Sequence, residues 1–131
     1  MPDVNVWAVL ACGVGSLVLG GLWYSPALFG KQWQKLARLS DEQMAGSNAR
    51  IFGLAFVLSL VAAYVFAMFL GREMGVGPAI AAGASAGLCW VAASFAINYL
   101  FERRPLPLWL INGGYHTLQF TLFGLIIGLM R

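Results

Sequence analysis

A single histidine, His116, stands in the middle of an apolar stretch and is the residue of this chain best suited to chemistry. Imidazole titrates near neutral pH and can donate or accept a hydrogen bond. Ionisable residues inside membrane-spanning helices are costly and often mark ion or proton paths. The alternative is a neutral imidazole that only ties helices together, and we favour this structural role because any buried polar group needs a partner.

Other polar residues accompany His116 at helical spacing on two neighbouring stretches. These polar stripes are Ser94, Asn98 and Glu102 on the first stretch, and Asn112, His116 and Gln119 on the second. Residues three or four apart share a helix face. A short turn makes the two helices an antiparallel hairpin, so we predict that Asn98 lies level with Asn112, and Ser94 with His116, and that the two stripes face each other.

Three further residues have two readings each. Glu102 precedes Arg103 and Arg104, so a local ion pair at the membrane edge is the favoured reading, and a gate or proton entry is the alternative. Tyr24 and Tyr115 are candidates for lining a cavity, although most aromatic residues near helix ends form an interfacial belt.

Motifs of known catalysis are absent from the sequence. It has no P-loop, GxGxxG, GxSxG or HExxH pattern, and Cys12 and Cys89 lie far from any CxxC spacing. We therefore expect no enzyme activity, no cofactor and no metal. The candidate site is a polar cluster made of Tyr24, Ser94, Asn98, Glu102, Asn112, Tyr115, His116 and Gln119.

The elements that position these residues follow from composition. Of the 131 residues 60% are apolar and only 10% charged, with a mean hydropathy of +0.78. Four stretches lack Asp, Glu, Lys and Arg, and each exceeds the roughly 20 residues that a membrane-spanning helix needs. We predict an all-α, integral membrane bundle: one domain, 1–131, with four transmembrane helices near 4–24, 50–70, 78–101 and 108–130.

A short amphipathic segment, 26–39, is predicted between the first two spans. Phe29, Trp33 and Leu36 would share one face, and basic residues another. This pattern is typical of a helix in the headgroup plane with its aromatic side chains in lipid. Ser40 and Gln43 then fit a capping box that starts a further helical turn.

Charge sets the expected orientation. Six of the eight Lys and Arg residues fall in the loops after the first and third spans, and Arg72 and Arg131 on the other side. The positive-inside rule then places both termini outside and the basic loops in the cytoplasm. The net charge of +3 is read as contact with anionic lipid, not with nucleic acid.

Small residues indicate how the helices pack. Gly83 with Gly87, and Gly124 with Gly128, form two GxxxG pairs. Such pairs let helix backbones approach closely. We favour packing within one chain over a contact between two copies, and both uses can coexist.

Two sequence runs carry a family resemblance: GGLWYSPALFGKQW, and INYLFERRPLPLWLINGGYH. They resemble domain of unknown function 1761, a bacterial family of predicted four-helix membrane proteins. The resemblance implies a multi-pass protein of the bacterial inner membrane, and it brings no activity with it. The corresponding positions are Trp23, Tyr24, Pro26, Gly30, Asn98, Glu102, Arg104, Pro105, Asn112, Gly114, Tyr115 and His116.

Both motifs place a proline just after a helix end, so the two ends could lie side by side. We therefore hypothesise a polar cluster near the cytoplasmic leaflet, made of Tyr24, Asn98, Glu102, Asn112 and His116. The function we prefer is an oligomeric transporter or channel for a small solute or ion. The alternatives are an accessory or scaffold subunit of a larger membrane complex, and a lipid- or quinone-binding protein.

Overall fold

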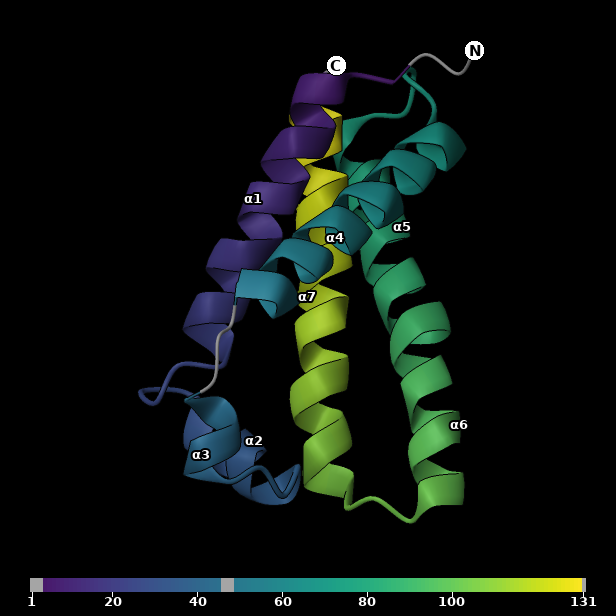
Figure 1. The fold of residues 1–131 in the computed structure, drawn as a ribbon. Helices are drawn as coiled ribbons and strands as arrows, with labels where there is room; N and C mark the ends of the chain where they lie inside the picture. Colours follow the sequence, from purple (N-terminus) through teal and green to yellow (C-terminus); the bar gives the residue numbers. More distant parts are fainter. Residues whose placement is uncertain (1–3, 46–48, 131) are drawn as a thin grey trace.

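The computed structural model describes residues 4–45 and 49–130, and this part of the chain is helical without strands (Figure 1). The four long helical segments begin and end within two residues of the expected bounds. The all-α class is thereby confirmed. In chain order the elements are α1 (Val6–Trp23), α2 (Gly30–Leu36), α3 (Asp41–Met44), α4 (Ala49–Leu70), α5 (Val76–Ala86), the π-helical η1 (Gly87–Ala92), α6 (Ala93–Glu102) and α7 (Leu106–Leu129).

Three helical segments of the described chain are long and apolar enough to cross a membrane: α1, α4 and the continuous run from α5 through η1 to α6. The chain is therefore compatible with a multi-pass membrane protein. The sequence predicts a fourth span in α7, but this helix is not among the three. It has 24 residues, and its polar residues Asn112, His116 and Gln119 lower its hydropathy.

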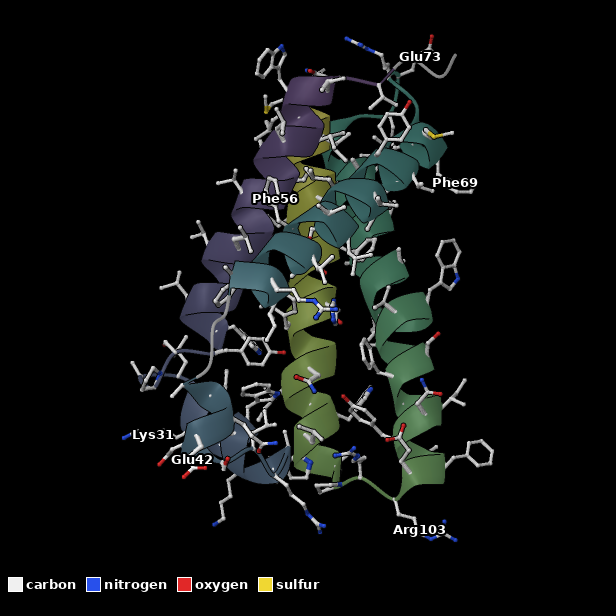
Figure 2. All side chains as sticks on the ribbon, viewed as in Figure 1. Lys31, Glu42, Phe56, Phe69, Glu73 and Arg103 are labelled. Carbon is white, nitrogen blue, oxygen red and sulfur yellow. The ribbon has the colours of Figure 1, made fainter. Side chains whose placement is uncertain are left out.

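Helix α7 is central to the fold, because α1, α2, α4, α5, η1 and α6 all contact it. Figure 1 shows that the two termini lie at one end of the molecule, and that α2, α3 and the α6–α7 turn lie at the other. Figure 2 places Lys31 and Arg103 at this second end and Glu73 at the first. A helix surrounded by others can carry polar side chains that lipid never meets.

Glycines let α5 and α7 approach until their backbones touch. A Cβ on Gly83 would lie 2.1 Å from the Phe120 carbonyl oxygen, and one on Gly124 would lie 2.1 Å from the Ala79 carbonyl oxygen. The other two glycines of the GxxxG pairs lie at the same contact, Gly87 against the His116 carbonyl oxygen and Gly128 against Val76. All four therefore pack within one chain, as small residues do where lipid supplies no hydrophobic drive.

One turn of π-helix changes the face that the second hairpin helix presents to α7. With ordinary helical spacing, the face of Gly83 and Gly87 would continue to Ser94 and Asn98. The η1 turn, Gly87–Ala92, inserts one extra residue. The face that meets α7 then continues through Ala92 to Phe95 and Tyr99, which contact residues of α7.

Apolar packing is concentrated at the end that holds the termini. The buried core there includes Cys12 from α1, Ala63 and Phe66 from α4, and Phe123 and Ile127 from α7. Helix α4 reaches this core only with its second half. Its first seven residues, 49–55, are all exposed, and it meets α1 where Leu60 and Phe56 lie over Gly13.

The segment between α1 and α4 is only partly as predicted. The capping box of Ser40 and Gln43 is present, but α2 covers 30–36 instead of 26–39. The Phe29 ring packs on Trp23, with ring centroids 4.7 Å apart, and Trp33 packs on Tyr24 at 5.3 Å. The two rings thus pack against the end of α1, and both side chains remain partly exposed. Gly30 is required here, because a Cβ would lie 2.2 Å from the Tyr24 carbonyl oxygen.

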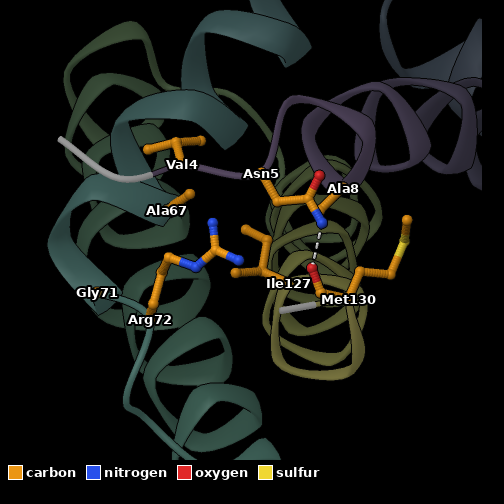
Figure 3. A pocket seen from close by; sticks show the side chains of 8 residues that line it. All are labelled: Val4, Asn5, Ala8, Ala67, Gly71, Arg72, Ile127 and Met130. Carbon is orange, nitrogen blue, oxygen red and sulfur yellow. Dashed lines mark hydrogen bonds between the residues drawn. The ribbon is translucent and has the colours of Figure 1, made fainter. Parts of the chain in front are cut away.

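The opposite end is closed by a contact between the two ends of the chain. Asn5 caps α1 by accepting from the Trp7 backbone N–H, and its side-chain amide donates to the Met130 carbonyl (Figure 3). The cavity beside this contact holds about 20 Å³, which suits about one water molecule. It is too small for a solute. Arg131 lies outside the described residues.

A substitution pair tests the glycine contact. We expect Gly83→Ala to destabilise the protein by about 1–3 kcal/mol, since the new methyl group would overlap the α7 backbone. Gly53→Ala on α4 is the control, because nothing lies within 4 Å of its Cβ position. Unfolding in mixed micelles, followed by circular dichroism, measures both. Equal stability of the two variants would contradict the close approach.

Candidate functional site

The first layer of the site joins three helices through one side-chain amide. The Tyr24 hydroxyl donates to Asn112 Oδ1 at 2.6 Å, and Asn112 Nδ2 donates to the Tyr99 hydroxyl oxygen at 2.8 Å. Asn112 on α7 thus links the end of α1 to α6. Since an amide has a donor group and an acceptor group, this pairing uses both.

The second layer lies one to two helical turns further along α7. His116 Nδ1 lies 2.8 Å from Gln119 Oε1. Gln119 Nε2 donates to Ser16 Oγ at 3.0 Å and to Ser59 Oγ at 3.4 Å. Ser16 is 2% exposed and Gln119 5% exposed. The layer therefore connects α7 to α1 and α4 in the interior, near the middle of each helix.

Aromatic rings hold the two layers together. The Phe95 ring is stacked on the His116 imidazole, with centroids 5.1 Å apart and planes at 13°. The Tyr115 ring packs against the same imidazole, with centroids 4.9 Å apart and planes at 71°, and it also contacts Tyr24 at 5.5 Å. The Tyr115 hydroxyl donates to the Ser16 carbonyl at 3.0 Å. The imidazole is thus held by two rings and at one nitrogen.

Glycines and tryptophans set the spacing around these layers. A Cβ on Gly20 would lie 3.5 Å from the Tyr115 ring, and one on Gly114 would lie 3.1 Å from the Trp23 ring. The Trp23 indole N–H donates to the Ile111 carbonyl at 2.8 Å. A side chain at Gly114 would displace the Trp23 ring, whereas a methyl group at Gly20 would only touch the Tyr115 ring.

The structure brings together five of the eight residues proposed as the polar cluster: Tyr24, Asn112, Tyr115, His116 and Gln119. It leaves the other three outside. Ser94 and Asn98 are exposed, and the Ser94 hydroxyl donates to the Trp90 carbonyl of its own helix. The two helices meet at the expected heights, because Tyr99 lies beside Asn112 and Phe95 beside His116. The π-helical turn, however, rotates Ser94 and Asn98 away from α7.

Glu102 lies at the exposed end of α6. Its carboxylate pairs with Arg104 at 3.3 Å, and both side chains are about half exposed. This geometry is that of the local ion pair, the favoured reading of this residue. A surface pair of this kind contributes little to stability, and Glu102 does not reach the cluster.

Sequence reasoning missed four residues of the site: Ser16, Ser59, Phe95 and Tyr99. Ser16 and Ser59 had a usable signal, because each is a polar residue in the middle of an apolar stretch. Phe95 and Tyr99 had none, since their position depends on the π-helical turn.

The chemistry of the site is that of neutral hydrogen-bonding groups. Among the described residues no group of three His, Cys, Asp or Glu side chains could hold a metal ion. Within that part of the chain, every buried side-chain nitrogen or oxygen has a hydrogen-bond partner. The interactions that the site offers are therefore hydrogen bonds and aromatic contacts.

Comparison with known proteins gives one match. A family model described as "Protein of unknown function (DUF1761)" matches residues 7–128, which confirms the resemblance stated from the two motifs. No curated protein and no solved structure matches the chain. Six of the motif positions gather at the site: Trp23, Tyr24, Asn112, Gly114, Tyr115 and His116.

A second substitution pair tests the rotated stripe. Asn112→Leu should cost about 1–3 kcal/mol, because it leaves the Tyr24 and Tyr99 hydroxyls without their shared partner. Asn98→Leu should change stability by less than about 0.5 kcal/mol, since Asn98 is exposed. Thermal unfolding in detergent compares them. The reverse order would place Asn98 in the interface, and the π-helical turn would be wrong.

Proposed function

The chain belongs to the DUF1761 family of proteins of unknown function, and from its site we propose a membrane protein that binds a small solute beside His116 and transports it. The observation that carries this proposal is the depth of the two polar layers. They begin at the α2 end with Tyr24 and Asn112 and reach Ser16, Ser59 and Gln119 in mid-helix.

The energetics support a role beyond packing. Polar residues inside a membrane are costly and often line solute or ion paths. Gln119 lies seven residues from Asn112, which is about 10 Å along the helix at 1.5 Å per residue. Apolar side chains would fill the same space without the cost of leaving a buried polar group unpaired. The side chains present are neutral, so they suit a neutral solute better than an ion.

The apolar half of the bundle argues against a permanently open channel. Beyond Gln119 the interior is filled by Cys12, Phe123 and Ile127. A solute that reaches His116 from the α2 end therefore meets a closed core. Passage requires that this core open after binding, which is the behaviour of a transporter instead of a pore.

Helix α4 is the element best placed to move. The α5–α7 contact is fixed by glycine-lined backbones, whereas residues 49–55 of α4 are exposed. In this proposal α4 rocks against α1, and the Gln119–Ser59 hydrogen bond, the longest of the network at 3.4 Å, opens when it does.

The proposal includes a membrane arrangement. Helix α7 would be a fourth span shielded by its neighbours, α2 would lie at the headgroups, and the α2 end, with Lys31 and Arg103, would face the cytoplasm of a bacterial inner membrane. Both termini would then be outside. A carboxy-terminal alkaline phosphatase fusion tests this orientation, and an inactive fusion would reverse it.

Substitution of His116 tests the transport proposal. We expect purified protein in liposomes to speed the re-swelling that follows a shift into hyperosmotic glycerol or urea, measured by light scattering. His116→Ala should lose at least about nine-tenths of this flux, since the site loses its central contact. Asn98→Ala, an exposed residue of α6, should keep it. Wild-type protein that moves neither these solutes nor ions would refute transport.

A second candidate, an accessory subunit or scaffold, is favoured by one observation. The exposed first turns of α4 offer a surface for another membrane protein, and in the transport proposal a second copy of this chain covers them. The intact mass after gentle extraction from the native membrane separates the two. We expect a homo-oligomer; a complex with a different, reproducible partner would favour the accessory role.

A further inference from the structure

We propose that the binding contact of the site is His116 Nε2 acting as a hydrogen-bond acceptor, so that the site selects molecules that donate an O–H or N–H. This inference deepens the proposed function and names its ligand class. It starts from the position of Gln119, which holds the other ring nitrogen of His116.

The two ends of the Gln119 amide have different partners. Its Nε2 donates to Ser16 Oγ and Ser59 Oγ, and its Oε1 lies 2.8 Å from His116 Nδ1. In this orientation of the amide its carbonyl oxygen faces Nδ1 and can only accept, so the inference places the proton of this hydrogen bond on Nδ1. Gln119 is therefore a positioning residue that sets the tautomer of the imidazole.

The imidazole has a neutral environment. Within the described part of the chain, the imidazole contacts the Gln119 amide and the rings of Phe95 and Tyr115, and the carboxylate of Glu102 is paired with Arg104 at the end of α6. An imidazolium without an anionic partner is unfavourable in such surroundings. A neutral ring with its proton on Nδ1 has a lone pair on Nε2, which can accept a hydrogen bond.

This second nitrogen is unpaired. Within the described residues Nε2 has no hydrogen-bond partner, while every buried side-chain nitrogen or oxygen has one. Nε2 is therefore not completely buried, and the proposal places the donor group of the ligand against it. The Phe95 ring on the imidazole face, with Tyr99 beside it at 5.8 Å, gives such a molecule an apolar wall.

Selectivity follows from the acceptor. A molecule with a hydroxyl or N–H completes the hydrogen bond, and one of the same shape with only acceptor atoms leaves both Nε2 and its own acceptor unpaired. A lost hydrogen bond of this kind lowers affinity by roughly ten- to a hundredfold. The ligand class is thus a small donor-bearing molecule, and an aromatic one would fit the wall best.

The test uses the fact that the chain has one histidine. Labelling with ¹⁵N-histidine gives an NMR spectrum of His116 alone, in which the two nitrogens report the tautomer. We expect a protonated Nδ1 and a bare Nε2. Gln119→Leu removes the acceptor and should move the proton to Nε2, while Thr117→Val, which only loses a bond within α7, should change nothing. A proton on Nε2 in the wild type would overturn the inference without reference to any variant.

Titration with phenol and anisole tests the ligand class. The two probes share a ring with one oxygen substituent and differ by a methyl group, and only phenol donates a hydrogen bond. Phenol should shift the Nε2 resonance at a concentration at least about tenfold lower than anisole does, and Gln119→Leu should abolish the difference. Equal responses in the wild type would refute donor selection.

These readouts are independent of flux, so the two proposals can fail separately. If the tautomer and the phenol preference are as expected but no solute crosses the liposomes, transport is wrong and the donor-selective site stands. If flux requires His116 but Nε2 carries the proton, transport stands and the inference is wrong.

Discussion

The contact on which the rest of this structure depends is the backbone approach of α5 and α7. Gly83 and Gly124 leave no room for a Cβ where the two helices meet, so the helices lie closer than side chains would otherwise allow. This contact places α7 where the other helices pack around it. Only in that central position can its row of polar residues point toward α1, α4 and α6 at once.

Much of this arrangement is predictable from the sequence. Long charge-free stretches define the helices to within two residues, and GxxxG spacing identifies the glycines that pack. The Ser40 and Gln43 capping box was also predictable, because it depends on local spacing alone. Helical periodicity likewise gave the level at which α6 residues meet Asn112 and His116.

Two features escaped sequence reasoning, for physical reasons. The π-helical turn has no side-chain signature, and it exchanges Ser94 and Asn98 for Phe95 and Tyr99 at the α7 contact. The second feature is the contact between α2 and the end of α1, because the pattern places Trp33 on an apolar face without showing that its ring packs on Tyr24. Both features depend on tertiary contacts that no local pattern contains.

The π-helical turn also decides which residues of this helix face α7 at a fixed chain length. If residues 87–92 closed into ordinary α-helical turns, everything after them would rotate by about 100° relative to α7. Phe95 and Tyr99 would then leave α7, and Ser94 and Asn98 would lie beside the imidazole in their place. Deletion of one residue within 87–92 would have the opposite result, because an unbroken α-helix would then keep Phe95 and Tyr99 at α7. A change between π and α hydrogen bonding in one turn would thus exchange an aromatic wall for a polar one without any change in sequence.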